Sequence, residues 1–180
     1  MMKILGENSL SSKTEKGLKI LFGIIAILDI FAVGIASVTL FSEFSSFSMR
    51  ENYLLKLVLE AVINFVFIMT GIVALFIIYQ FIKIFRNLRE NKLFEKDNLK
   101  YLNKISVFSL IIGVLYLICL LGISIFLRNY NSFEILSNVL IKILILVFAL
   151  AFLIFGIGIK ILTQIYQEAI RYKEENDFTI

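Results

Sequence analysis

Four long apolar stretches alternate with short polar segments along the chain. The apolar stretches cover residues 20–40, 54–82, 105–127 and 139–162. Each is long enough as a helix to cross the roughly 30 Å hydrocarbon core of a bilayer, because a helix rises about 1.5 Å per residue. The pattern predicts an all-α membrane protein, with residues 1–180 forming a single up-down bundle of four transmembrane helices.

The polar segments predict what lies outside the membrane. Residues 83–104 join the second and third spans, and a break at Asn91 and Lys92 indicates a helical hairpin there. An amphipathic tail, residues 163–180, follows the fourth span. Near the start of the chain, the pair Ser11 and Ser12, with Glu15 three residues after Ser12, is typical of a helix cap.

Composition agrees with a membrane protein. Apolar residues make up 59% of the chain and the mean hydropathy is +0.92. Soluble domains are about 45–50% apolar, so a soluble fold is excluded. The first apolar stretch has 21 residues, more than the roughly 7–15 of a signal peptide, which favours a retained span.

Basic residues are distributed unevenly between the two ends of the spans. Of the 18 Lys and Arg residues, four precede the first span, seven lie in residues 83–104, and three lie at the end of the fourth span and in the tail. Only four belong to the other two connections. Basic residues gather on the cytoplasmic side of membrane proteins, so both termini and the central segment are predicted to be cytoplasmic.

The sequence lacks the residue types and motifs on which many enzymes depend. There is no histidine and only one cysteine, Cys119, and no phosphate-binding, HExxH or GxSxG motif occurs. We therefore expect no catalytic residue, no metal and no cofactor. Direct binding of nucleic acid is not expected either, because the central segment is too short for a three-helix DNA-binding core. Gly156 and Gly158 do not share a helix face and predict local softness in the fourth span.

Asp29 is unusual because it lies near the middle of the first span. A carboxylate at that depth costs roughly 2.5–3.5 kcal/mol on insertion scales. It could hold the bundle together as a protonated or hydrogen-bonded group, line a polar cavity for a proton, ion or ligand, or contact another subunit. Thr70 and Tyr116 reach a similar depth and are candidate partners, so Asp29 is expected to face the bundle.

A second polar group is predicted near the outer ends of the spans. Glu60 and Asn64 are four residues apart and share a face of the second span. Lys142 of the fourth span has a similar depth. A structural ion pair is favoured over a ligand site.

The central segment and the tail have complementary charge. They could dock on one another, form a platform for a cytoplasmic partner, or contact anionic membrane lipids. The candidate surface consists of Arg89, Phe94, Lys96, Asn98, Lys100, Lys104, Glu174, Glu175 and Asp177.

These two segments also carry a family resemblance. Phe94 followed by Asn98 and Leu102, and a tail reading Glu-Glu-Asn-Asp-Phe-Thr from residue 174, resemble the YoaS-like family of small bacterial four-span membrane proteins of unknown function. Members often have Pro at the position of Leu93 and Leu at the position of Phe178. The resemblance extends from the first span to the end of the chain. It implies a bacterial inner-membrane protein, often encoded beside a small helix-turn-helix regulator, and implies no activity.

The leading hypothesis is a non-enzymatic regulatory membrane protein that binds such a regulator through residues 81–106 and 164–180. The alternative is a ligand- or peptide-responsive resistance or immunity protein, or a small transporter component, with its site near Asp29. The sequence also permits a homo-oligomer.

Overall fold

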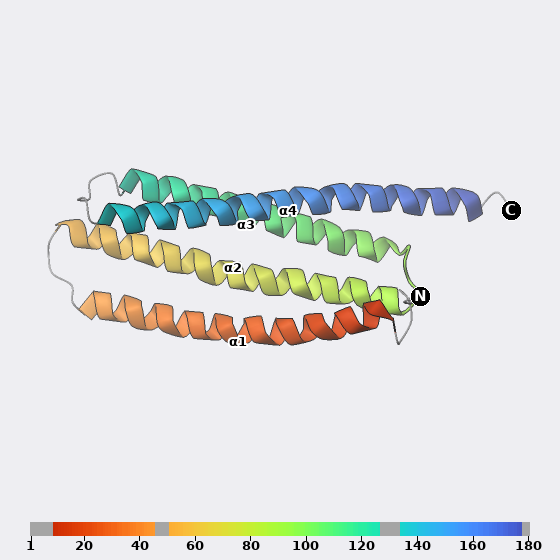
Figure 1. The fold of residues 1–180 in the computed structure, drawn as a ribbon, viewed down its shortest axis with the longest axis horizontal. Helices are drawn as coiled ribbons and strands as arrows, with labels where there is room; N and C mark the ends of the chain where they lie inside the picture. The colour runs from red at the N-terminus through yellow and green to blue at the C-terminus, as the bar shows by residue number, and fades with distance from the viewer. Residues whose placement is uncertain (1–8, 46–50, 127–133, 178–180) are drawn as a thin grey trace.

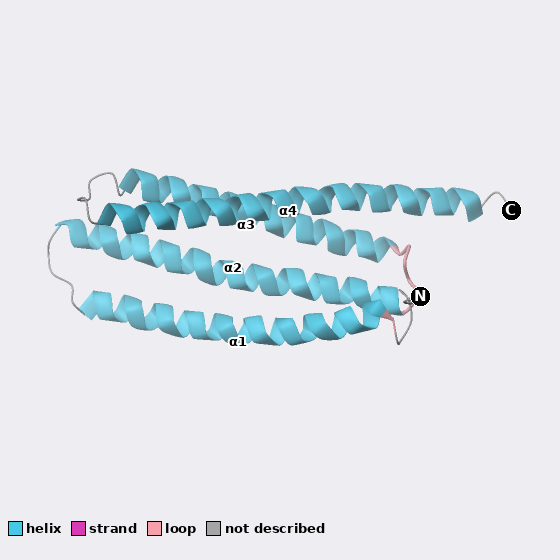
Figure 2. Cartoon of the chain, in the orientation of Figure 1, coloured by secondary structure: helices cyan, strands magenta, loops and turns pink. Residues whose placement is uncertain are grey.

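The computed structural model describes residues 9–45, 51–126 and 134–177. Over these residues the chain forms four long helices: α1 (Leu10–Ser45), α2 (Glu51–Arg89), α3 (Lys96–Phe126) and α4 (Glu134–Asp177). They run alternately up and down, and α2 and α3 are joined by a short turn (Figures 1 and 2). This confirms the predicted all-α arrangement of four helices.

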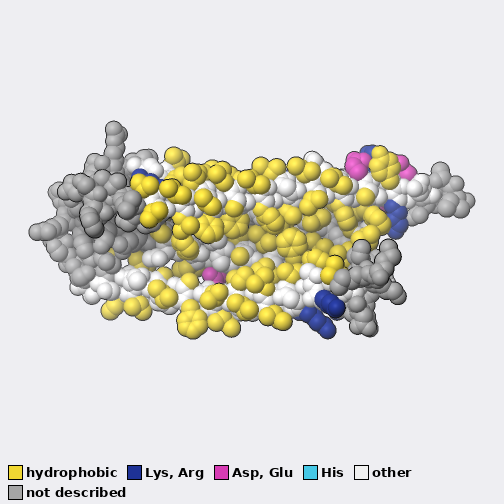
Figure 3. All heavy atoms as spheres, viewed as in Figure 1, with side chains coloured by type: hydrophobic (Ala, Val, Ile, Leu, Met, Phe, Trp, Pro, Cys, Tyr) yellow, Lys and Arg dark blue, Asp and Glu magenta, His cyan; other side chains and the backbone are white. Residues whose placement is uncertain are grey.

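All four helices are long and apolar enough to cross a bilayer. The candidate spans are Leu10–Ser42, Ala61–Arg89, Lys96–Ser124 and Lys142–Asn176. The helices have 36, 39, 31 and 44 residues, so each is longer than the roughly 20 residues that a span needs. The protein is therefore a multi-pass membrane protein. A broad apolar surface covers the middle of the molecule (Figure 3).

The turn after α2 confirms the predicted break. Asn91 has a φ of 63°, in the left-handed region that Asn adopts more easily than most residues. Its N–H donates to the carbonyl of Leu88, and the N–H of Lys92 donates to the carbonyl of Asn87. These two bonds form a Schellman motif, which satisfies the last carbonyls of the helix and stops it.

The predicted cap of the first helix was one turn too late. Helix α1 begins at Leu10, and the side-chain oxygen of Ser9 accepts a hydrogen bond from the N–H of Ser12 at 3.4 Å. Ser9 is therefore the capping residue, and Ser12 lies inside the helix. Glu15 does not take part in the cap; its carboxylate instead forms ion pairs, which are described below.

The helices pack in series along the chain. Among the described residues, α1 packs against α2, α2 packs against α3, and α3 packs against α4. The central apolar cluster comes from the last three helices: Val73, Ile77, Ile105, Ile112, Tyr116, Cys119, Ile123, Ile145, Ala149 and Ile159. None of the described residues of α1 belongs to this cluster, and the helix lies against α2 at one edge of the molecule (Figure 1).

Small residues bring α3 and α4 close together. A methyl group at Gly113 would lie 2.8 Å from the side chain of Leu153, and one at Gly156 would lie 2.9 Å from Leu110. The hydroxyl of Ser106 donates to the carbonyl of Gly156 at 2.8 Å. Gly156 is thus a packing position, which corrects the prediction of local softness there. A methyl group at Gly158 would meet open space.

One end of the molecule collects the start of α1, the turn between α2 and α3, and the end of α4, which extends beyond the other helices (Figure 1). We call it the basic end, because 13 of the Lys and Arg residues that the structure describes belong to the segments that meet there. This arrangement brings the turn and the tail, which are far apart in sequence, onto one surface.

Candidate functional site: the turn and tail at the basic end

Asn98 is the centre of the contact between the turn and the tail. Its side chain is only 1% exposed and makes hydrogen bonds to three parts of the chain. The side-chain amide of Asn87 on α2 donates to Oδ1 of Asn98 at 2.7 Å. Nδ2 of Asn98 donates to the carbonyl of Lys92 in the turn at 3.0 Å, and to the hydroxyl of Tyr166 on α4 at 3.0 Å. One buried amide therefore ties α2, the turn, α3 and α4 together.

Aromatic and charged contacts surround this amide. The ring of Phe94 stacks on that of Tyr166, with centroids 6.4 Å apart. Lys173 lies 5.5 Å above the Phe94 ring, and Lys96 forms a 3.0 Å ion pair with Glu174. The turn and the tail thus dock on one another, which is one of the arrangements considered from the sequence. We call this the turn–tail surface, made of Phe94, Lys96, Asn98, Lys100, Tyr166, Lys173, Glu174 and Glu175.

The turn–tail surface stays accessible at its rim. Phe94 is 39% exposed. Lys100 pairs with Asp97 at 2.9 Å, and Glu175 approaches Arg171 at 3.7 Å. Aromatic residues are enriched at protein-binding surfaces, and the rims of such surfaces are polar, so an exposed ring bordered by charged groups is compatible with protein binding.

Two of the expected surface residues, Arg89 and Lys104, have other surroundings. Arg89 faces α1 instead of the tail, and Lys104 is exposed on α3. The side chain of Asp177 lies outside the described residues. In the turn itself, the Glu90 carboxylate accepts a hydrogen bond from Lys92 and raises the pKa of that ammonium above its usual value.

Glu15 was not singled out as a site residue from the sequence, and it connects α1 to the basic end. Its side chain is 1% exposed, yet three cations surround it. Lys19 lies 2.6 Å from its carboxylate, Arg89 3.2 Å and Arg86 3.9 Å. The excess of basic residues in the central segment is the only sequence signal for this contact. Tyr166 and Asn87 were also missed. Tyr166 lies 68 positions from its partner Asn98 along the chain, and Asn87 lies on a different helix from Asn98.

The intramembrane group is brought together in part. The hydroxyl of Thr70 hydrogen-bonds to that of Tyr116 at 2.9 Å. The carboxylate of Asp29 lies against Gly71 of α2, where a methyl group would overlap it. Asp29 therefore faces α2, but among the described residues no side chain hydrogen-bonds to it. Acidic atoms are visible between apolar side chains at mid-length (Figure 3).

The outer polar group is not assembled among the described residues. Asn64 and Lys142 are half-buried, and no hydrogen bond joins them. Their helices, α2 and α4, share no extended contact. The side chain of Glu60 lies outside the described residues, so its predicted ion pair stays a prediction.

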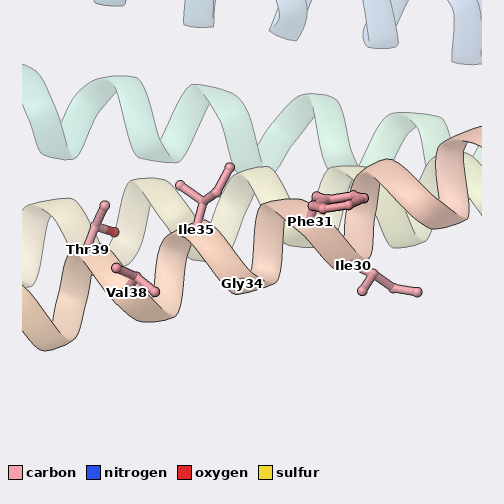
Figure 4. Close-up of a pocket in the computed structure, with 6 residues that line it drawn as sticks. All are labelled: Ile30, Phe31, Gly34, Ile35, Val38 and Thr39. Carbon is pink, nitrogen blue, oxygen red and sulfur yellow. The ribbon is translucent and has the colours of Figure 1, made fainter.

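Other features offer little polar chemistry. A shallow hollow on α1 is lined by Ile30, Phe31, Gly34, Ile35, Val38 and Thr39 (Figure 4). The Thr39 hydroxyl already donates to the carbonyl of Ala36, so the hollow is an apolar surface of one helix. Within residues 9–45, 51–126 and 134–177, no three Cys, Asp or Glu side chains gather as a metal site would require.

Comparison with known families matches residues 49–180 to the model described as "Protein of unknown function (DUF2975)". The chain belongs to this family. The match begins just before α2 and shows a family of unknown function over residues 49–180, whereas the more specific resemblance to the YoaS-like family stays a prediction. Among curated proteins and among solved structures, no match was found. The family's matched region contains the turn and the tail, whereas α1 and Glu15 lie outside it.

Proposed function

We propose that this protein is a regulatory membrane protein of the bacterial inner membrane that binds a cytoplasmic partner protein through the turn–tail surface. The distribution of basic residues supports cytoplasmic termini. The observation that carries the proposal is the Asn98 network, which joins the turn to the tail before any partner arrives.

Preorganisation is the physical reason for this proposal. A partner that binds a surface already held in place does not have to order it, which reduces the entropic cost of association. Burial of an amide is costly unless its hydrogen bonds are made, and the bond from Asn98 to Tyr166 is made only when the tail is docked on the turn. A purely solvated membrane face would not need such a network.

The resemblance to the YoaS-like family suggests what the partner is. Its members are often encoded beside a small helix-turn-helix regulator, so that class of protein is our first candidate. The exposed lysines of α3 and the aromatic ring of Phe94 would meet an acidic surface with an apolar pocket. In this proposal the protein holds the regulator at the membrane and has no enzymatic activity.

Co-purification from gently solubilised membranes tests the proposal. We would compare the intact protein with a variant carrying Lys96→Glu and Lys100→Glu. A matched control carries Lys13→Glu and Lys16→Glu, which change the same charge at the same end but on α1. A partner that is retained by the intact protein and the control, and lost from the first variant, would support the proposal. Equal recovery of all proteins with the three forms would refute it.

A second candidate function is suggested by Asp29. Its carboxylate lies against Gly71 without a hydrogen-bonding side chain among the described residues. A bare carboxylate at this depth suits a ligand with an amine or another hydrogen-bond donor, in a ligand-responsive protein or a transporter component. Asp29→Asn would abolish that function, whereas partner binding through the turn–tail surface would survive the substitution.

A further inference from the structure

Lys83 is held between two tyrosine rings at the contact between α2 and α3. Its ammonium lies 4.4 Å from the ring centroid of Tyr79 and 5.3 Å from that of Tyr101. The side chain is half-buried, and no acidic side chain among the described residues pairs with it. A cation held by aromatic faces keeps its full charge for an external anion.

The position of Lys83 along α2 matches the membrane boundary. Residues 61–82 contain no charged residue, and Lys83 is the first charge after them. Tyrosine rings favour the same depth, because their apolar bodies and polar hydroxyls suit the headgroup region. The three side chains Tyr79, Lys83 and Tyr101 therefore lie where the phosphates of membrane lipids lie.

The α2–α3 contact provides a second cation and an apolar floor. Lys104 follows Tyr101 by three residues, so it lies on the same side of α3, and it is exposed. About two turns deeper than Lys83, Phe76 contacts Phe108 with ring centroids 4.4 Å apart. The acidic residue nearest in sequence on α3, Asp97, is already paired with Lys100.

We infer that Lys83 and Lys104, flanked by Tyr79 and Tyr101, bind the phosphate of an anionic phospholipid. The acyl chains of that lipid lie along Phe76 and Phe108. At the same end of the molecule, Lys96 is engaged with Glu174 and Arg89 with Glu15. The site is independent of the turn–tail surface, and its lysines are not those changed in the co-purification test.

Lipid retention by the purified full-length protein tests this inference. The protein in detergent is mixed with phosphatidylglycerol or with phosphatidylcholine of the same acyl chains, and bound lipid is counted by native mass spectrometry. We expect selective retention of phosphatidylglycerol. The double change Lys83→Gln and Lys104→Gln should weaken it about 25-fold, since each basic residue near the surface contributes about fivefold. Lys83→Arg with Lys104→Arg should restore retention.

The control removes the same charge from α1 through Lys13→Gln and Lys16→Gln. It should retain phosphatidylglycerol as the intact protein does, and added inorganic phosphate should not displace the lipid. Equal retention of the two lipids by the intact protein would overturn the inference. An equal loss in both double variants would also overturn it, because it would mean diffuse attraction to the basic end. Circular dichroism of each variant verifies that its helices are intact.

Discussion

The side-chain amide of Asn98 donates a hydrogen bond to the hydroxyl of Tyr166, 68 positions away along the chain, at 3.0 Å. The two residues belong to α3 and α4, so this bond locks the start of one helix to the tail of another. Asn98 is almost completely buried, and its side chain is the shared hydrogen-bonding partner of Asn87, Lys92 and Tyr166. The predictions below begin with this pair.

Replacing Asn98 should loosen the whole basic end. Asn98→Ala leaves the amide of Asn87 and the carbonyl of Lys92 without their partner; an unsatisfied group costs about 1–3 kcal/mol when fully buried, and less here because Asn87 is half-buried and Lys92 is exposed. We expect faster hydrogen exchange in the end of α4, measured by mass spectrometry. Tyr166→Phe is the matched control, because it removes one hydrogen bond and keeps the stacking on Phe94. Unchanged exchange in Asn98→Ala would show that the network does not hold the tail.

Glu15 should control the attachment of α1 to α2. Glu15→Gln removes the charge that pairs with Lys19, Arg86 and Arg89, and breaking a buried ion pair typically costs about 3–5 kcal/mol. Those cations are partly exposed, so we expect a loss at or below the lower end of that range. Thermal unfolding in detergent measures it. Lys13→Gln, an exposed change two residues away, should shift the melting temperature little, and equal shifts in both variants would contradict the assignment.

Gly71 and Asp29 should be energetically coupled. Gly71→Ala places a methyl group where the Asp29 carboxylate lies, and overpacking of this kind costs about 1–3 kcal/mol. Adding Asp29→Ala removes the obstacle, so the double variant should be more stable than Gly71→Ala alone. A double-mutant cycle of unfolding free energies gives the coupling. Strictly additive effects would mean that the two residues do not touch.

The two neighbouring glycines of α4 should respond differently to a methyl group. Gly156→Ala forces the methyl against Leu110 and should destabilise the protein by about 1–3 kcal/mol. Gly158→Ala meets open space and should be neutral or slightly stabilising, because alanine favours the helix by about 1 kcal/mol over glycine. The comparison is made by thermal unfolding of both variants. Similar losses in both would argue against close packing at Gly156.

Membrane orientation is open to direct measurement by labelling of single cysteines. In a Cys119→Ser background, Glu90→Cys places a thiol in the turn between α2 and α3, and Ser45→Cys places one at the opposite end of the molecule. In spheroplasts, a membrane-impermeant maleimide should label Ser45→Cys directly and Glu90→Cys only after permeabilisation. The reverse pattern would invert the predicted orientation.

Particular residues show how far sequence reasoning reached. The turn at Asn91 was predicted, because its cause lies in the local chemistry of an Asn that tolerates a positive φ. The hydrogen bond between Thr70 and Tyr116 joins two residues that were grouped by depth alone. By contrast, the role of Gly156 was mistaken, because the close approach of α3 to α4 depends on which helix faces meet.

The sequence by itself determined that the chain crosses the membrane, how many helices do so, and where the central turn falls. Each of these depends on local hydrophobic length or backbone preference. The tertiary structure decided the order in which helices touch, the burial of Glu15 beside Arg89, and the network of Asn98. The physical reason is that lipid-facing and helix-facing positions are both apolar in a membrane span, so hydrophobic pattern does not distinguish them.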